Sequence, residues 1–225
     1  MYRVIRENGS YYVRIDFDGK PHYLTITNEK ILFHSEFLVK LVNEGEVEEC
    51  TVNSVMKSLV YGLLYELGTR RIEVNKKLES LLKNITDGNV KSTSEINQVR
   101  SEIITLYSDS SALYYLSKKL SKFLDKEVED DCLFAYDRAE ILITRESELY
   151  NIYLTEIQND LNIVIKKLTS ISFIFLPITA VASILAISFN DLPSNLNSPY
   201  FGLSLVLLVL LGIALTIYLR KIDWL

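Results

Sequence analysis

The chain has 225 residues, 24 of them Lys or Arg and 29 Asp or Glu, so its formal net charge is −5. Its mean hydropathy is positive, at +0.15, although 24% of its residues are charged, which indicates a polar part joined to a separate apolar part. The acidic balance, with no run of Lys or Arg longer than a doublet, argues against nucleic acid as a partner and favours a cation.

The first 50 residues have the pattern of a small sheet. Segments 1–7, 11–18 and 22–27 alternate in polarity and are rich in β-branched and aromatic residues, and Asn8-Gly9 and Asp18-Gly19 separate them. We predict a three-stranded meander in a small N-terminal domain, residues 1–53. Because the N-terminus has no apolar core of a signal peptide, we expect this part to stay in the cytoplasm.

Residues 54–129 are expected to form a helical hairpin. Its first helix stops at the turn signal 86–89, and its second starts where Ser92 and Glu95 form a possible capping box. The first helix carries one apolar face: Leu67, Val74, Leu78, Leu81 and Ile85. The second carries a seam at alternating spacings of three and four, with two serines expected to loosen its middle: Ile96, Val99, Ile103, Leu106, Ser110, Leu113, Ser117, Leu120 and Leu124.

A third helix is expected to serve as a stalk, residues 130–167, that runs directly into the membrane. It starts near Asp130 or Asp131, which suit a helix N-terminus, and neither Gly nor Pro interrupts it before Pro177. At 1.5 Å per residue, a helix of roughly 55 to 60 residues spans about 85 Å. Its seam has no partner within one hairpin, so we expect self-association through Leu154, Ile157, Leu161, Val164 and Leu168.

Two uncharged segments are long enough to cross a membrane, residues 168–189 and 200–219. The basic doublets Lys166-Lys167 and Arg220-Lys221 flank them, whereas the connecting loop, residues 190–199, has no Lys or Arg. By the positive-inside rule the loop faces out and both termini, including the basic tail 220–225, lie in the cytoplasm. The sequence therefore predicts a mainly α-helical integral protein of the cell membrane, in contact with lipid.

The first membrane segment carries a polar stripe. If the segment is one helix, Ser172, Leu176, Thr179, Ser183 and Ala186 share one face, because they recur at intervals of four and three. Such a stripe either packs closely against another helix or lines a wet pore, and the residues alone favour packing. Pro177 leaves one carbonyl without its usual donor, and the kink that it predicts fits both interpretations.

The C-terminal half of the chain resembles the CorA family of divalent cation channels. The resemblance rests on features between residues 130 and 225: Tyr153-Leu154, Asn159, Asn162, Lys167-Leu168-Thr169, Phe175-x-Pro177-x-Thr179, Phe189, Pro193 and the terminal Trp224-Leu225. It implies a homopentamer that passes Mg²⁺, with Co²⁺ or Ni²⁺ as further possibilities, and no covalently bound cofactor. It also implies a shortened N-terminal domain, and feedback closure by intracellular Mg²⁺ is then expected to be weak.

The resemblance assigns the pore-lining and outer-mouth positions. The Gly-Met-Asn signature of the family is replaced here by Ala186-Ile187-Ser188, and a ring of shorter serine side chains predicts a wider and less selective mouth. Leu168 and Leu176 would be the apolar constrictions. The pore-lining residues that the resemblance implies are Asn162, Ile165, Leu168, Ser172, Leu176, Thr179, Ser183, Ala186, Ile187 and Ser188. In an oligomer, Asp191 would form an outer ring of negative charge that attracts cations.

Two acidic clusters outside the membrane segments have two interpretations. They either bind regulatory divalent ions between subunits, as acidic residues do in the family, or are ordinary solvated charges, which the sequence favours. The clusters are Glu44, Glu46, Glu48 and Glu49, and Glu127, Glu129, Asp130 and Asp131. His22 and His34 are isolated and read as ordinary fold residues, and Cys50 and Cys132 show neither disulfide nor zinc spacing.

Two functions remain open at this point. Neither a glycine-rich phosphate loop nor a nucleophile–base pattern is recognisable, so we do not expect an enzyme. The first hypothesis is a CorA-like homo-oligomeric channel for divalent cations with altered selectivity at its mouth. The alternative is a non-conducting CorA-like assembly, anchored in the membrane, with a structural or partner-binding role.

Overall fold

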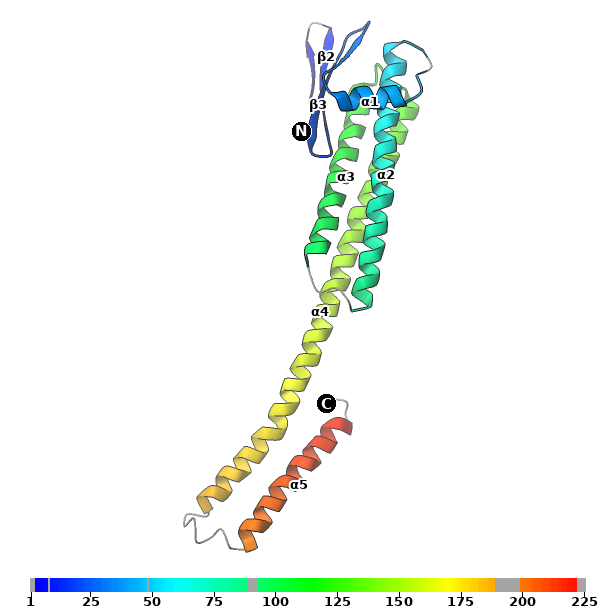
Figure 1. Ribbon diagram of the computed structural model, residues 1–225. Coiled ribbons are helices and arrows are strands. Elements are labelled where there is room, and N and C mark those ends of the chain that lie inside the picture. The colour runs from blue at the N-terminus through cyan, green and yellow to red at the C-terminus, as the bar shows by residue number, and fades with distance from the viewer. Residues whose placement is uncertain (1–2, 8, 48, 89–92, 189–198, 222–225) are drawn as a thin grey trace. The chain divides into compact units, whose positions relative to one another are not determined.

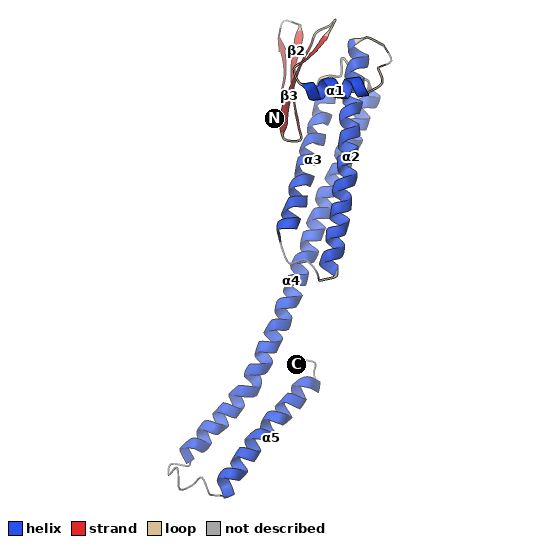
Figure 2. Cartoon of the chain, in the orientation of Figure 1, coloured by secondary structure: helices blue, strands red, loops and turns tan. Residues whose placement is uncertain are grey.

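The computed structural model describes residues 3–7, 9–47, 49–88, 93–188 and 199–221. Most of these residues are helical, and a small antiparallel sheet precedes the long helices (Figure 1, Figure 2). The chain divides into two compact units, Met1–Tyr153 and Leu154–Leu225, and the boundary falls inside the long helix α4 (Lys126–Ser188). The predicted mainly helical fold, with its small N-terminal sheet and its stalk helix continuous with the first apolar segment, is confirmed.

The sheet of the first unit is an antiparallel meander of four strands. In sheet order they are β1 (Arg3–Glu7), β2 (Ser10–Phe17), β3 (Lys20–Ile26) and β4 (Ile31–Phe33). The turn between β2 and β3 is the predicted one, and Asp18 and Gly19 both have positive φ, at 52° and 72°, as a tight hairpin turn of this kind requires. The prediction of three strands was wrong, because β4 has only three residues, too few to show alternation.

One face of the sheet contributes to the hydrophobic core of the first unit. The alternating side chains of β2 and β3 that are buried there are Val13, Ile15, Phe17, Leu24 and Ile26. A short helix, α1 (Glu36–Glu44), lies inside the segment predicted to be β-rich, and its Phe37 stacks on Phe17 with ring centroids 5.5 Å apart. His22 has its Nδ1 2.7 Å from Ser35 Oγ, and burial lowers the pKa of the imidazole.

Helices α2 (Val52–Thr86) and α3 (Thr93–Lys119) form the predicted hairpin, and the predicted seam residues of both are buried. The two serines of the α3 seam donate to carbonyls of their own helix, Ser110 to Leu106 and Ser117 to Tyr114, each at 2.8 Å. The helix ends at Lys119. The last two predicted seam residues, Leu120 and Leu124, follow the helix and are also buried. Ser92, the predicted cap, lies outside the described residues.

Helix α4 starts earlier than predicted. It begins at Lys126 rather than near Asp130. Lys126 pairs with Glu129 and Asp130, one turn further along, with N–O distances of 3.3 Å for both. The residues of its first half that are buried in the core of the first unit are Val128, Cys132, Ala139, Leu142 and Leu149. The hydroxyls of Tyr107 on α3 and Tyr136 on α4 lie 3.0 Å apart and join the two helices.

A buried carboxylate links the sheet to the helices. Asp109 on α3 accepts a hydrogen bond from Arg70 Nη1 on α2 at 2.8 Å, and another from the backbone N–H of Asp18 at 3.0 Å. The side chain of Asp109 is only 5% exposed, and burial raises the pKa of its carboxyl, whereas these two donors act in the opposite direction. Arg70 also lies over the ring of Phe17, 5.3 Å from its centroid. One network therefore fixes the β2–β3 turn against α2 and α3.

Candidate functional site

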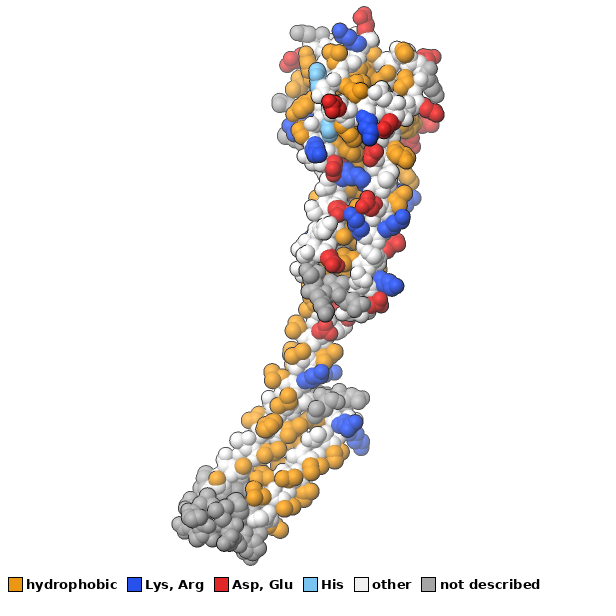
Figure 3. Space-filling view, in the orientation of Figure 1, with side chains coloured by type: hydrophobic (Ala, Val, Ile, Leu, Met, Phe, Trp, Pro, Cys, Tyr) orange, Lys and Arg blue, Asp and Glu red, His pale blue; other side chains and the backbone are white. Residues whose placement is uncertain are grey.

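The second unit consists of the second half of α4 and of helix α5 (Pro199–Lys221), which run antiparallel (Figure 1). Both helices are long and apolar enough to cross a membrane, and only 6% of the most apolar window of each is buried. Figure 3 shows hydrophobic side chains gathered over these two helices. An exposed apolar surface of this extent is typical of a surface that lipid or other subunits cover.

Helix α5 covers one face of α4. At Gly212 an added Cβ would lie 3.2 Å from Ile178 Cδ1, so the two helices meet at a residue without a side chain. Ser170 on α4 and Leu219 on α5 are fully buried or nearly so, at 0% and 2% exposure. In the second unit, the α4 residues that are buried or half-buried form one stripe at helical spacing: Ser170, Ile174, Pro177, Ile178, Val181 and Ala182. This stripe was not predicted, because it depends on where α5 lies.

The predicted pore residues lie on the opposite face of α4. At about 100° per residue, their stripe points away from the stripe that α5 covers. Those with described side chains are all exposed: Asn162, Ile165, Leu168, Ser172, Leu176, Thr179, Ser183 and Ala186. The polar stripe therefore does not pack against the second membrane helix of its own chain. The side chains of Ile187 and Ser188 lie outside the described residues, although α4 extends to Ser188, and Asp191 also lies outside them.

The hydroxyl groups of the stripe bond to their own helix. Thr179 Oγ1 donates to the carbonyl of Phe175 at 2.7 Å, and Ser183 Oγ donates to the carbonyl of Thr179 at 2.8 Å. On α5, Thr216 bonds to Gly212 in the same way at 2.8 Å, so this is how a hydroxyl meets an apolar environment in either helix. Because each hydroxyl proton is directed to the backbone, its oxygen lone pairs are left for a donor or a cation on the exposed side. A row of such oxygens can solvate a cation better than an anion.

The acidic residues at the start of α4 have partners within the chain. In addition to the pairs of Glu129 and Asp130 with Lys126, Glu127 lies 4.0 Å from Lys57 Nζ. Burial and the nearby Asp131 carboxylate raise the pKa of the Tyr61 hydroxyl. The carboxylates of Glu129 and Asp130 raise the pKa of Lys126. Among the residues that the structure describes, no three His, Cys, Asp or Glu side chains gather as metal ligands. Within one chain, Glu127, Glu129 and Asp130 therefore form ion pairs at a helix start.

Comparison with known proteins places the chain in a family. The family model described as "CorA-like Mg2+ transporter protein" matches residues 17–221. The Cobalt/magnesium transport protein CorA of Thermotoga maritima is 22% identical over 195 residues, which are 81% of this chain and 56% of that protein. The chain thus spans little more than half the length of this relative.

A solved structure has the same fold. The CorA magnesium transporter from Methanocaldococcus jannaschii matches with a TM-score of 0.76 at 17% identity, over 100% of this chain and 80% of that chain. At this identity the match concerns the fold, and the family model extends over most of the sequence, including the helices described above. The chain belongs to the CorA family.

Proposed function

We propose that the chain is a subunit of a homo-oligomeric channel that carries a divalent cation across the cell membrane. Mg²⁺ is the first candidate and Co²⁺ an alternative, in keeping with the family and with the two relatives named above. Ni²⁺ is a further alternative, which the resemblance implies. The observation that carries the proposal is the position of the polar stripe on the exposed face of α4, opposite to α5. Both termini would lie in the cytoplasm, because the basic doublets flank the two apolar helices on that side.

A closed ring of subunits would give each face of α4 a suitable environment. In such a ring the exposed stripe of each α4 faces the axis, and α5 lies outside it against lipid. The seam that precedes the membrane segment is also uncovered in one chain, with Leu161, Val164 and Leu168 exposed by 55%, 60% and 65%. Apolar side chains this exposed in a stalk indicate contact with neighbouring stalks. We take the ring to have five members, as the family resemblance implies.

The path along the axis would alternate between wet and dry segments. Leu168 and Leu176 are 65% and 68% exposed on the stripe, and Ser172 lies between them. Five leucine side chains around one axis form an apolar constriction that water leaves easily, and this can close a pore without a moving plug. The oxygens of Thr179 and Ser183 would then receive the ion on the outer side of the second constriction.

The outer mouth would be less selective than one with the Gly-Met-Asn signature of the family. Ala186-Ile187-Ser188 stands where the family signature is Gly-Met-Asn, and a serine reaches less far toward the axis than an asparagine. Mg²⁺ sheds its water reluctantly, so a mouth holds the hydrated ion through hydrogen bonds to its waters. Fewer such contacts predict weaker discrimination, and Asp191 would add a ring of charge that attracts any cation.

Ion flux into liposomes that contain the purified full chain tests the proposal. We expect influx of Mg²⁺, and slower influx of Co²⁺ or Ni²⁺, with empty liposomes as the control. The departure from Gly-Met-Asn favours a second candidate, a non-conducting assembly anchored in the membrane. Flat traces for all three ions from an intact oligomer would contradict the channel and support that second candidate.

A further inference from the structure

Two adjoining cavities lie between α2 and α4 in the first unit. The first has a volume of about 340 Å³ and a mainly apolar and aromatic lining that includes Tyr61, Tyr65 and Phe134. The second has a volume of about 550 Å³ and a mixed lining that includes the polar side chains of Asn75 and Arg145. Arg71 and Arg138 line both cavities, so they lie where the two cavities join.

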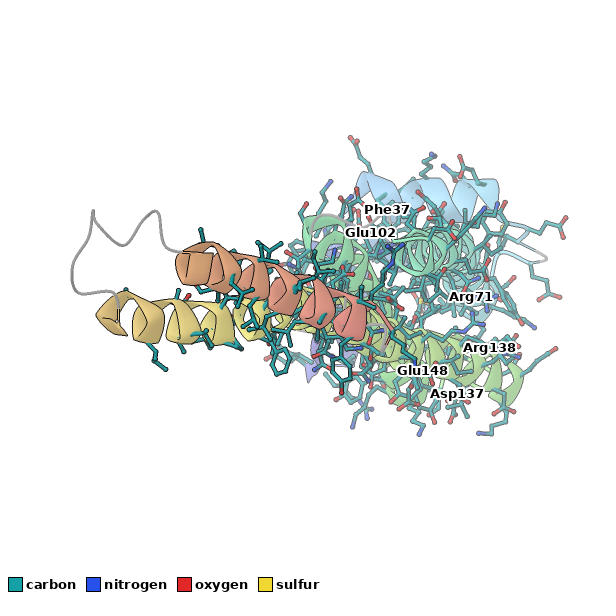
Figure 4. All side chains as sticks on the ribbon, turned by 90° about the horizontal axis from the view of Figure 1, so that it is seen from below. Phe37, Arg71, Glu102, Asp137, Arg138 and Glu148 are labelled. Atoms are coloured by element: carbon teal, nitrogen blue, oxygen red, sulfur yellow. The ribbon has the colours of Figure 1, made fainter. Side chains whose placement is uncertain are left out.

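The two shared arginines have no anionic partner. Neither guanidinium makes a hydrogen bond or an ion pair with any residue that the structure describes, and that of Arg138 lies over the ring of Phe134, 4.8 Å from its centroid. Figure 4 labels both and shows that they come from α2 and α4 on the same side of the bundle. Two guanidinium groups that line one cavity can both bind a phosphate group or another anion there.

The remaining charges of the lining leave it positive. Lys76 and Arg145 join the two shared arginines, and the lining contains only two carboxylates, those of Glu79 and Asp131. The Glu79 carboxylate is engaged, since it accepts from Asn75 Nδ2 at 2.9 Å. Burial and the nearby Asp131 carboxylate raise the pKa of the Tyr61 hydroxyl. Arg145 Nη1 donates to Asn75 Oδ1 at 2.8 Å, which holds its guanidinium at the polar cavity. A cationic cavity in a chain of net charge −5 indicates an anionic ligand.

Gly68 also indicates that the apolar cavity is open to a ligand. It lines the apolar cavity in the interior of α2, and an added Cβ would meet no heavy atom within 4 Å. A glycine in a helix interior costs about 1 kcal/mol relative to alanine, so packing gives no reason for it. By contrast, a Cβ at Gly62 of the same helix would lie 3.2 Å from Leu41 Cβ, and the approach of α1 explains that glycine. The effect of Gly68 is to keep the cavity open.

We propose that these cavities bind a nucleoside di- or triphosphate, with its base among Tyr61, Tyr65 and Phe134 and its phosphates at Arg71, Arg138 and Arg145. Aromatic side chains stack on bases, and arginine binds phosphate oxygens through two parallel hydrogen bonds. The two volumes are in the range of small-molecule sites. The site lies in the first unit and does not depend on ion conduction.

Calorimetric titration of the full chain in detergent tests this site. ATP, inorganic tripolyphosphate and adenosine are titrated in buffer with EDTA, so that cation binding contributes no heat. We expect ATP to bind at least about tenfold more tightly than tripolyphosphate or adenosine, because only ATP fills both cavities. Gly68→Leu should lower the affinity for ATP at least about tenfold and leave the melting temperature unchanged or higher, because it fills open space in a helix. Gly202→Leu, at another helical glycine with open space around it, is the matched control.

The arginines are tested in the same assay. Arg71→Gln combined with Arg138→Gln should weaken ATP binding at least about tenfold, whereas Arg6→Gln, which removes a guanidinium 5.5 Å above the ring of Tyr11, should not. Absence of binding by the wild type at millimolar ATP, or unchanged binding by Gly68→Leu, would overturn the proposal. Equal affinities for ATP and tripolyphosphate would overturn the proposal that the aromatic side chains bind the base. Dissociation of the oligomer by the double variant, without ATP binding by the wild type, would show that the arginines join subunits instead.

Discussion

Gly212 on α5 lies directly against Ile178 on α4, and this contact decides which face of α4 remains open. A Cβ at position 212 would lie 3.2 Å from Ile178 Cδ1. Because α5 occupies this side, the stripe that contains Ser172, Leu176 and Thr179 faces away from the rest of its own unit. The orientation of the proposed pore therefore depends on a small residue on the neighbouring helix.

Enlarging that residue should separate the two helices. Gly212→Leu would place a branched side chain where Ile178 already lies, and overpacking of this kind costs about 1–3 kcal/mol. We expect a lower melting temperature in detergent and reduced ion flux. Gly202→Leu on the same helix meets open space and should change neither quantity. Equal melting temperatures for the two variants would show that α5 does not pack on α4 through Gly212.

The buried pair of Arg70 and Asp109 should contribute to stability in a pH-dependent way. Arg70→Met leaves the Asp109 carboxylate without its cation, and we expect a loss of about 3 kcal/mol near neutral pH. Burial raises the pKa of Asp109 above its ordinary value of 3.8. As the pH falls through this raised pKa, the carboxyl becomes neutral and no longer needs the cation, so the loss should shrink.

Thermal unfolding of the wild type, Arg70→Met and Arg70→Met/Asp109→Asn over a range of pH checks this. The double variant should recover part of the loss at neutral pH and show little dependence on pH, because it has no buried charge. A loss for Arg70→Met that stays constant as the pH is lowered would contradict the role given to the carboxylate.

The stalk should hold the subunits together. Leu161 is 55% exposed in one chain and belongs to the uncovered apolar seam. Leu161→Lys places a charge in the proposed contact between stalks and should dissociate the complex, as measured by light scattering in detergent. Glu156→Lys, on the other side of α4, is the control. An unchanged mass for Leu161→Lys would remove this residue from any subunit interface.

The outer mouth should regain selectivity when the family signature is restored. The triple variant Ala186→Gly, Ile187→Met and Ser188→Asn adds amide side chains that can bond the waters of hydrated Mg²⁺. At about 0.5–1.5 kcal/mol per hydrogen bond, a ring of added contacts should improve discrimination against monovalent ions by roughly one to two decades. Ser188→Ala should lower it. Selectivity and block by cobalt hexammine measure this, and three indistinguishable profiles would place the mouth elsewhere, with Asp191 the next candidate.

Much of the helical part could be predicted from the sequence, because its patterns lie within single helices and are long. From Lys126 to Ser188 only Pro177 interrupts the residues that favour a helix, and the apolar seams of α2 and α3 repeat over many turns, so each signal is long. The short strand β4 was missed because three residues are too few to show the alternation of a strand. The start of α4 was predicted near Asp130, whereas the helix begins at Lys126, which pairs with Glu129 and Asp130.

Features that need two elements to be placed together could not be predicted. The α5 contact at Gly212 depends on the rotation of α4 and α5 about their axes. Hydropathy does not reveal this rotation, because α5 is apolar all round and the polar stripe of α4 fits either a helix contact or a pore. Arg71 and Arg138 are far apart in the sequence and share a cavity only because α2 and α4 lie side by side. No pattern within α3 marks Asp109, whose partners are Arg70 on α2 and the backbone of Asp18 in the β2–β3 turn.

The central claim, that the exposed face of α4 lines an ion path, is tested most directly by cysteine accessibility. Cys132 is buried, and burial raises the pKa of its thiol to about 12, so only the exposed Cys50 needs replacement, by serine. In this background, Thr179→Cys places a thiol on the stripe, and Val181→Cys places one on the face toward α5. We predict that a water-soluble cationic thiosulfonate blocks Mg²⁺ flux through Thr179→Cys and leaves flux through Val181→Cys unchanged. Block of Val181→Cys alone, equal block of both, or no block of Thr179→Cys would contradict the account.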